Sequence, residues 1–338
     1  MRQTLILTGD VNLLNVGDPA IPFARVADVL GKADVVFGNL ESCLYDPPEQ
    51  HSLEEEGFYA GSAAGAALKL GGFHAVGCAN NVNYGAEAIS ASLARLDELG
   101  IRHTGAGVDR KAARSPVVLE RDGVRFGFLQ KTSVFWPSGH EAGEHSPGVA
   151  TIKGHTAYQP KVSNRPGVSP IIITWADEQD LTMLREEIAS LRKQADVVIS
   201  SYHWGLAEEV LQYQVQIARA AIESGADIVM GHGPHFPLGI EVYRGKPIFY
   251  GLGCFSFHTA HRGRVAGDWV GLAARVTLED GKIQKAACSP VRHNERNETI
   301  IRSVKEEMAA MEHLVKLSKK FGAVLDLSGD EVIVWQKV

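Results

Sequence analysis

The chain of 338 residues is 45% hydrophobic and 22% charged, which is an ordinary composition for a globular protein. Its length allows one large domain or two smaller ones, with enough apolar side chains for a sizeable core. The net charge is −6, the pI is about 6.1, and no segment collects lysine and arginine in a block. This charge pattern argues against nucleic acid as the main partner.

Four cysteines lie far apart in the sequence and form no CxxC pair, which indicates reduced thiols in a cytoplasmic protein. The amino terminus has one arginine before the apolar run 5–7, which is too short for a signal peptide or a membrane span. Asp10 already belongs to the candidate site, which leaves no room for a leader. We therefore expect a soluble, cytoplasmic protein without a membrane partner.

The first third of the chain alternates short apolar strands with helices. The pattern predicts strands at 4–7, 34–37, 73–78 and 101–104, and helices at 21–30, 62–70 and 85–99. The last of these helices has Ile89, Leu93 and Leu96 at helical spacing and stops at Gly100. Such alternation is typical of a largely parallel sheet with crossover helices.

Antiparallel features begin at residue 117. Strands 117–120 and 124–130 flank an Asp122-Gly123 turn, which predicts a β-hairpin. Residues 133–169 are rich in Gly, Pro, Ser and His, and they predict a long loop with His140, His145 and His155 on a solvated surface.

The alternation then resumes and gives way to hairpins. We expect strands at 171–174, 197–199 and 228–230, helices at 178–193 and 213–224, then strands at 239–242, 247–250 and 270–278. An amphipathic helix at 298–321 and a hairpin turning at 328–330 complete the chain. One mixed α/β domain fits this order better than two separate domains.

Polar side chains follow the predicted strands, where the carboxyl ends of parallel strands gather ligand-binding residues. They are Asp10, Asn39, Glu41, Asn80, Asn81, His203, His232 and His235. Oxygen ligands together with neutral imidazoles suit Mn, Fe or Zn better than Ca or Mg. The sequence therefore predicts a site for one or two divalent transition metals.

These segments resemble the motifs of the CapA family, named for poly-γ-glutamate capsule biosynthesis, within the calcineurin-like metallophosphoesterase superfamily. The motifs are Gly9-Asp10, Asn39-Leu40-Glu41, Asn80-Asn81, His203-Trp204-Gly205 and Gly231-His232-Gly233-Pro234-His235. The resemblance implies a four-layer α/β/β/α sandwich with mixed sheets. It also implies a family domain at 1–290, on which a C-terminal helix and hairpin at 291–338 pack.

The resemblance further implies roles for individual residues. As metal ligands it implies Asp10, Glu41, Asn81, His203, His232 and His235, with Glu41 as the bridging carboxylate. Asn80 and Glu208 are the candidates for catalytic roles, and Asn12, Asn39, Trp204, His258 and Arg262 for substrate contacts. Simpler interpretations stay open at this point: Asn81 as a helix cap, Trp204 as a core residue and Glu208 as a first-turn helix carboxylate.

The sequence departs from the family pattern at four places. Asn12 stands where the superfamily has the histidine of Asp-x-His, and Val82 replaces the imidazole expected to protonate a leaving group. Glu208 comes one residue after the expected glutamate, and Cys254 replaces the asparagine of Gly-Asn-Phe. These changes concern the reaction more than the fold.

The leading functional hypothesis is a metal-dependent hydrolase of a small anionic substrate that uses a metal-bound hydroxide as nucleophile. The bond expected first is a phosphate ester, and a γ-glutamyl or other amide is the second option. The alternative is a non-catalytic binding or accessory protein of a poly-γ-glutamate or other biosynthetic system. A dinucleotide-binding oxidoreductase is disfavoured, since no GxGxxG follows the first strand.

Overall fold

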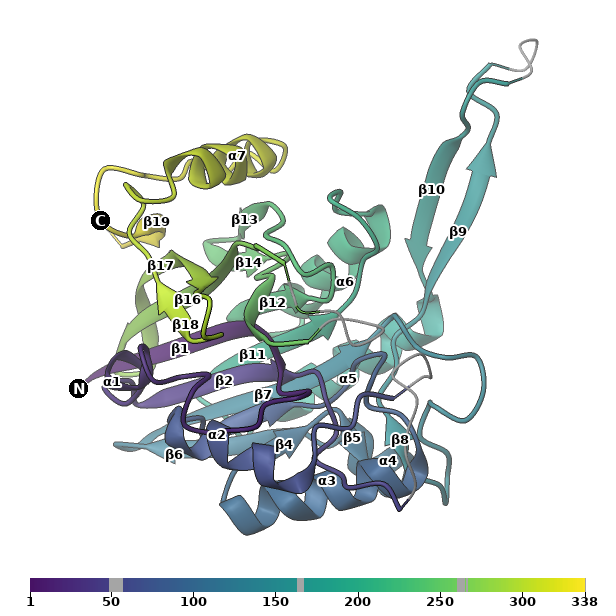
Figure 1. Ribbon diagram of the computed structural model, residues 1–338. Helices are drawn as coiled ribbons and strands as arrows, with labels where there is room; N and C mark the ends of the chain where they lie inside the picture. The colour runs from purple at the N-terminus through teal and green to yellow at the C-terminus, as the bar shows by residue number, and fades with distance from the viewer. Residues whose placement is uncertain (49–56, 163–166, 260–264, 266, 338) are drawn as a thin grey trace.

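The computed structural model describes residues 1–48, 57–162, 167–259, 265 and 267–337 (Figure 1). A nine-stranded sheet combines strands from the first third of the chain with its carboxyl-terminal strands. Its parallel part runs β1 (Arg2–Asn12), β2 (Val35–Leu40), β3 (Ala75–Gly77) and β4 (Arg102–Thr104). The connections contain α1 (Ala27–Leu30), the 3₁₀ helix η1 (Ser62–Gly65), α2 (Ala66–Leu70) and α3 (Ala86–Leu99). The predicted strand–helix alternation is confirmed, although α1 is shorter than expected.

The other part of this sheet comes from the end of the chain. Its strands are β15 (Cys254–Phe257), β16 (Gly271–Glu279), β17 (Lys282–His293), β18 (Thr299–Ile301) and β19 (Val332–Gln336). Strand β15 pairs with β1 in parallel, and β16 pairs with β1 antiparallel. Residues 290 and 291 both lie within β17, so the segment after 290 continues the same sheet.

A six-stranded sheet has the order β13–β14–β12–β11–β7–β6. The elements are β6 (Val117–Arg121), β7 (Val124–Thr132), β11 (Val197–His203), β12 (Ile228–His232), β13 (Ile240–Tyr243) and β14 (Lys246–Phe249). The helices α5 (Glu178–Arg192) and α6 (Gln212–Glu223) connect its central parallel strands. Both hairpins predicted here are confirmed, β6–β7 and β13–β14.

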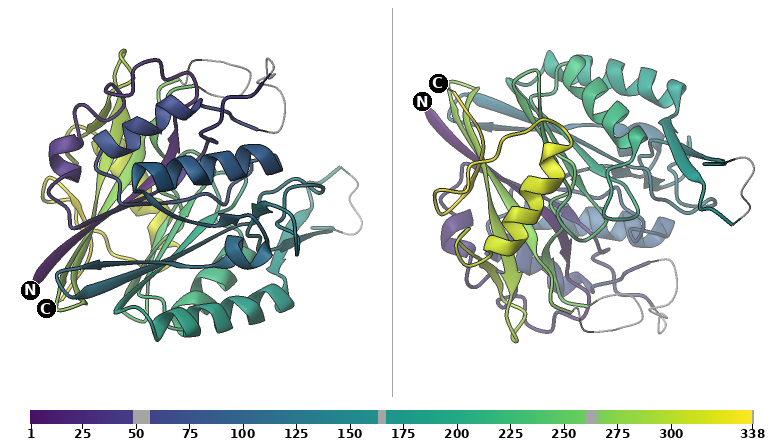
Figure 2. Two further views of the ribbon diagram at one scale, coloured as in Figure 1. Left: turned by 90° about the horizontal axis from the view of Figure 1, so that it is seen from below. Right: turned by 90° about the horizontal axis from the view of Figure 1, so that it is seen from above.

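The central strands are buried on both faces, which explains why they appear as continuous apolar runs. Val197 and Ile199 join one core cluster with strands of both sheets, while Val198 between them joins the cluster with α5 and α6. Phe37 of β2 stacks on Phe128 of β7, with ring centroids 4.6 Å apart, so the sheets face one another. A further cluster joins the nine-stranded sheet to α1, α2 and α3. The views of Figure 2 show α2 and α3 on one side of the paired sheets and α5 and α6 on the other.

Part of the expected loop at 133–169 is instead regular structure. It contains β8 (Gly148–Val149), which pairs with β5 (Ala106–Gly107) near the short α4 (Arg110–Arg114). It also contains β9 (Gly154–Gln159), which pairs antiparallel with β10 (Ile171–Ala176). The predicted strand at 171–174 therefore exists, but it lies in a projecting two-stranded hairpin and not in a central sheet (Figure 1).

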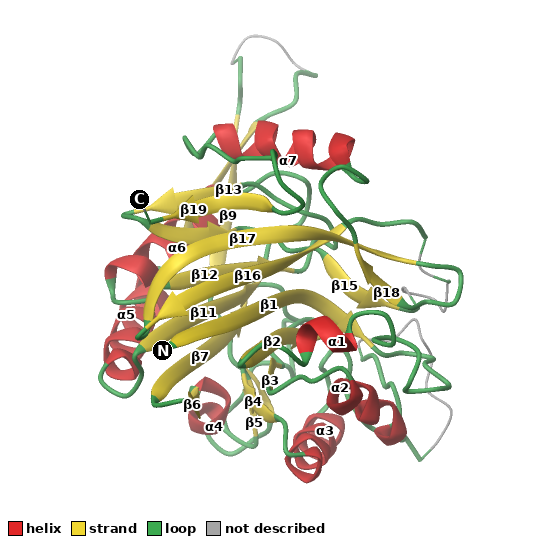
Figure 3. Ribbon diagram, turned by 90° about the vertical axis from the view of Figure 1, so that its left-hand side faces the viewer, coloured by secondary structure: helices red, strands yellow, loops and turns green. Residues whose placement is uncertain are grey.

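The carboxyl-terminal region also differs from the expectation. The predicted helix at 298–321 begins later than expected, because residues 299–301 form β18. This strand pairs with β17, and the backbone N–H of Thr299 donates to Pro22 O. Helix α7 is confined to Met308–Lys319 and buries Met311 and Leu314 against the edge of the sheets (Figure 3). Together these elements form a mixed α/β fold. None of the described helices is long and apolar enough to cross a membrane.

Candidate metal centre

Asp10 lies at the centre of the candidate site, near the end of β1, and is fully buried. Its Oδ2 lies 3.0 Å from Nδ1 of His235 and accepts a 3.3 Å hydrogen bond from the backbone N–H of Gly233. Its Oδ1 accepts a 2.9 Å hydrogen bond from Asn39 and lies 3.6 Å from Nδ1 of His232. Burial favours the protonated carboxyl, but the contact with His235 and the nearby imidazoles outweigh it and lower the pKa of Asp10.

His232 at the end of β12 and His235 in the turn after it both lie next to this carboxylate. His235 has a backbone φ of 68°, a left-handed conformation that is uncommon for residues other than glycine. Its ring packs edge-on against Phe257, with centroids 4.7 Å apart. Strain of this kind persists where the surroundings fix it, and it is common at functional sites.

His203 and His232 end the neighbouring strands β11 and β12, where they are partners in the parallel register. Their Nδ1 atoms lie 3.3 Å apart, and both side chains are buried. Burial is the main cause that lowers the pKa of His203 to about 3 and of His232 to about 4. Both rings are therefore neutral near pH 7, the form in which imidazole binds a metal.

Glu41, just beyond β2, is a second buried carboxylate at the site. Its Oε1 lies 3.7 Å from Nε2 of His235, and its Oε2 accepts a 3.4 Å hydrogen bond from Asn39. Burial and then the charge of Asp10 raise the pKa of Glu41 well above its ordinary value. Within the described residues, neither carboxylate pairs with a lysine or an arginine.

The donor atoms form two groups that share Asp10. Ligand atoms of Asp10, His203 and His232 lie within 4.8 Å of one another, as do those of Asp10, His235 and Cys254. Asp10 is thus the carboxylate common to both groups, and the bridging role of Glu41 stays a prediction. Two adjacent buried carboxylates that pair with no lysine or arginine of the described residues, beside the neutral imidazoles of His203 and His232, fit a divalent transition metal.

The sequence analysis did not predict Gln130 of β7 as a site residue. Its side chain holds Asn39 in place beside Asp10 and Glu41. The backbone N–H of Ala79 donates to Gln130 Oε1 at 2.7 Å, and this contact fixes which way the amide faces. Gln130 Nε2 then donates to Asn39 Oδ1 at 2.9 Å, so that Asn39 presents its NH₂ to Asp10 and Glu41. Gln130 follows Phe128 and Leu129 in β7, but its contact with Asn39 has no local sequence signal.

Two of the predicted site residues have structural contacts that account for them. Asn80 donates to Asn39 Oδ1 and Leu40 O, and its own oxygen accepts from the backbone of Val82 and Asn83. Its amide is therefore hydrogen-bonded at both ends and supports Asn39, and its catalytic role stays a prediction. Asn12 is buried, donates to Thr259 O and accepts from Leu14 N, which makes it a turn residue.

Asn81 differs from its neighbour. Its side chain is half-buried and makes no hydrogen bond to any other described residue, while its carbonyl oxygen accepts from Trp136 Nε1. Asn81 is therefore free to act as a ligand, whereas its role as a helix cap has no supporting contact.

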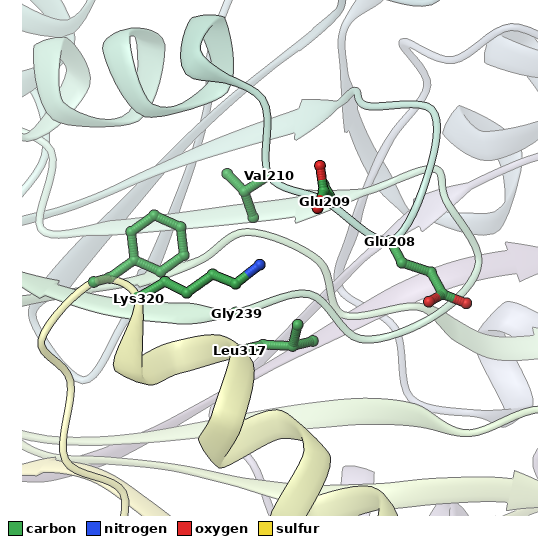
Figure 4. A pocket seen from close by; sticks show the side chains of 7 residues that line it. Glu208, Glu209, Val210, Gly239, Leu317 and Lys320 are labelled. Carbon is green, nitrogen blue, oxygen red and sulfur yellow. The ribbon is translucent and has the colours of Figure 1, made fainter. Parts of the chain in front are cut away.

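Trp204 and Glu208 lie away from the ligand atoms. Trp204 is fully buried, stacks on Tyr202 with centroids 4.7 Å apart and donates to Tyr250 O, contacts that are typical of a core residue. Glu208 is exposed and lines a surface hollow of about 110 Å³ with Leu317 and Lys320 (Figure 4). It makes no contact with the candidate ligands among the described residues.

His258 and Arg262 were the predicted contacts to an anionic substrate. His258 follows β15 and is half-buried, and burial lowers its pKa. Arg262 lies outside the described residues.

The structure thus defines a mixed α/β protein with a buried carboxylate–imidazole centre at the strand ends. Residues 4–259 match the family model described as bacterial capsule synthesis protein PGA_cap. The chain therefore belongs to this family, and the resemblance to CapA is confirmed.

Individual relatives agree with this assignment. The chain is 29% identical over 307 residues to an uncharacterized protein, y4sH, of Sinorhizobium fredii, covering 75% of this chain and 66% of the relative. It is 30% identical over 241 residues to the PGA biosynthesis protein CapA of Bacillus subtilis, covering 70% and 56%. The chain thus spans about two thirds or less of the length of these relatives.

A solved structure supports the fold. The crystal structure of a hypothetical protein from Thermus thermophilus superposes with a TM-score of 0.52 at 14% identity, covering 87% of this chain and 100% of the other. At this identity the likeness concerns the fold alone.

Proposed function

We propose that the protein is a metal-dependent hydrolase of a small anionic substrate, with a phosphate ester as the first candidate and a γ-glutamyl or other amide as the second. One observation carries the proposal: Asp10 contacts histidines that end or follow β12, more than 220 residues later in the chain. Such a buried charge cluster needs a cation as its counterpart. Membership in a capsule synthesis family is compatible with work on glutamate polymers.

The residues that would hold the metal are Asp10, His203, His232, His235 and Glu41, with Asn81 as a further oxygen donor. When bound, a divalent Mn, Fe or Zn ion supplies Lewis acidity and lowers the pKa of a coordinated water. Burial keeps the imidazoles of His203 and His232 neutral, and Gln130 and Asn39 orient Asp10. The half-buried His258 is a candidate contact to the anionic group of the substrate.

The proposal includes a specific architecture and setting. We infer that the two facing sheets are the inner layers of a four-layer α/β/β/α sandwich, with residues 291–338 as an extension of the domain at 1–290. A cytoplasmic location and a small anionic partner stay predictions, as does the absence of nucleic acid.

The test combines metal analysis with turnover. Protein purified without chelator should contain about one or two Mn, Fe or Zn ions per chain by mass spectrometry, and His232→Asn should lose most of them. With added Mn²⁺ or Zn²⁺, the protein should cleave bis(p-nitrophenyl) phosphate, and His235→Asn should abolish cleavage. His145→Asn, at an imidazole that is 90% exposed, is the matched control. A folded protein that stays metal-free and inactive after adding either ion would refute the proposal.

The non-catalytic alternative rests on Val82, where the family places an imidazole. Val82 is buried in a small apolar cluster with Leu14 and Phe58. His140 approaches the same turn, but its Nε2 contacts Asn83 O and its Nδ1 accepts from Trp136 N, so it has no nitrogen free for proton transfer. Metal binding in full stoichiometry, with no turnover of phosphate esters or γ-glutamyl amides, would favour an accessory role.

A further inference from the structure

Cys254 occupies a fixed place beside the candidate metal centre. It is the first residue of β15 and is the register partner of Asp10 in the parallel pairing with β1. The backbone N–H of Asp10 donates to Gly253 O at 2.9 Å, which ties the two strands together at this point. The thiol is buried.

The sulfur lies with two other ligand atoms. Cys254 Sγ, a carboxylate oxygen of Asp10 and a ring nitrogen of His235 are all within 4.8 Å of one another. Asp10 and His235 are in direct contact at 3.0 Å. The other three cysteines belong to neither ligand group of the described residues.

The main chain around Cys254 packs closely between β1 and β16. A Cβ at Gly271 would lie 1.7 Å from Cys254 O, and a Cβ at Gly9 would lie 1.8 Å from Gly253 O. Glycine at these two positions allows β1 and β16 to approach the start of β15 this closely. The position of the sulfur is thereby set by the sheet and not by a flexible loop.

We propose that the Cys254 thiolate is a metal ligand together with Asp10 and His235, and that it makes this half of the centre select zinc over manganese or magnesium. This inference rests on the metal centre of the proposed function and adds which metal that centre prefers. A sulfur–metal bond forms as the S–H bond breaks, and the proton leaves to solvent. A thiolate is a soft ligand that favours Zn²⁺, whereas an asparagine oxygen at this place suits Mn²⁺ or Mg²⁺.

Cobalt substitution tests this directly, with a readout that does not depend on activity. The metal-depleted protein loaded with Co²⁺ should show visible d–d bands and a near-ultraviolet sulfur-to-cobalt charge-transfer band. Cys254→Ser should lose the charge-transfer band and keep the d–d bands, with far-ultraviolet circular dichroism as the check on folding. Cys288→Ser, at a buried thiol of β17, is the matched control and should keep both.

Metal affinities give a second measurement. In chelator competition, Cys254→Ser should weaken Zn²⁺ binding by more than about tenfold and Mn²⁺ binding by much less. Co²⁺ d–d bands without a charge-transfer band in the unmodified protein would overturn the role of Cys254 and leave the metal centre intact. Absence of all Co²⁺ bands would overturn both this inference and the proposed function.

Discussion

Replacing His140 with glutamine should remove part of the sensitivity of the fold to acid. His140 is fully buried in the segment after β7, although the sequence predicted a solvated side chain. Its Nδ1 accepts from Trp136 N and its Nε2 lies 3.0 Å from Asn83 O, so the neutral ring satisfies two backbone groups. Burial lowers the pKa of His140 from 6.5 to about 4.

The sign and size of the effect follow from proton linkage. A lowered histidine pKa means that the unfolded chain binds this proton first, so stability falls as the pH decreases from 6.5 towards about 4. At pH 5.0 the unfolded chain is mostly protonated at this position and the folded chain mostly neutral. At about 1.4 kcal/mol per pH unit below 6.5, His140 should account for a loss of about 2 kcal/mol at pH 5.0.

The assay is urea denaturation of the unmodified protein and His140→Gln in EDTA, at about pH 7.5 and about pH 5.0. The difference in unfolding free energy between the two pH values should be about 2 kcal/mol smaller in His140→Gln. His145→Gln, which removes an exposed imidazole of the same segment, should behave like the unmodified protein. Equal pH dependence in all three proteins would refute this account of His140.

Four further predictions concern buried and half-buried polar side chains. Gln130→Leu should free Asn39 and weaken Mn²⁺ or Zn²⁺ affinity about tenfold or more, measured by chelator competition. Gln3→Leu is its control for affinity, and it should raise the unfolding free energy by about 1 kcal/mol, since this buried amide has no hydrogen-bond partner within the described residues. Glu187→Gln should lower the unfolding free energy by about 3 kcal/mol, since it leaves the buried Lys131 ammonium, 2.7 Å from Glu187, without its partner. Lys131→Met should change the unfolding free energy by no more than about 1 kcal/mol. The reason is that burial disfavours the charged ammonium and lowers the pKa of Lys131 to about 8. A larger loss of unfolding free energy in Lys131→Met than in Glu187→Gln would contradict this reasoning.

Local sequence patterns predicted the central strands because burial on both faces requires a continuous run of apolar residues. The runs at 197–199 and 228–230 are apolar on both faces, and they form strands of a parallel sheet covered on both sides. The run Ile171–Thr174 looks the same in sequence but lies in a hairpin with Ile172 57% exposed. Its pairing with β9 distinguishes it from the central strands, and the sequence did not predict β9 because residues 133–169 have the composition of a loop.

Site residues that lie at strand ends could be predicted from the sequence, whereas contacts between residues far apart in the sequence could not. Asp10, His203 and His232 were found because each lies at a strand end. Gln130 acts through a contact with Asn39 across 91 residues, and Cys254 reaches the site through its register with β1. Neither pairing has a local sequence signal.

The β9–β10 hairpin should open locally under conditions in which the rest of the fold stays intact. Its base is held by Tyr213, whose backbone N–H donates to Thr174 Oγ1, whereas Tyr158 and Ile172 further out are largely solvent-exposed. Two strands alone are marginally stable in water. The outer amides of the hairpin should therefore exchange with deuterium far sooner than those of the facing sheets.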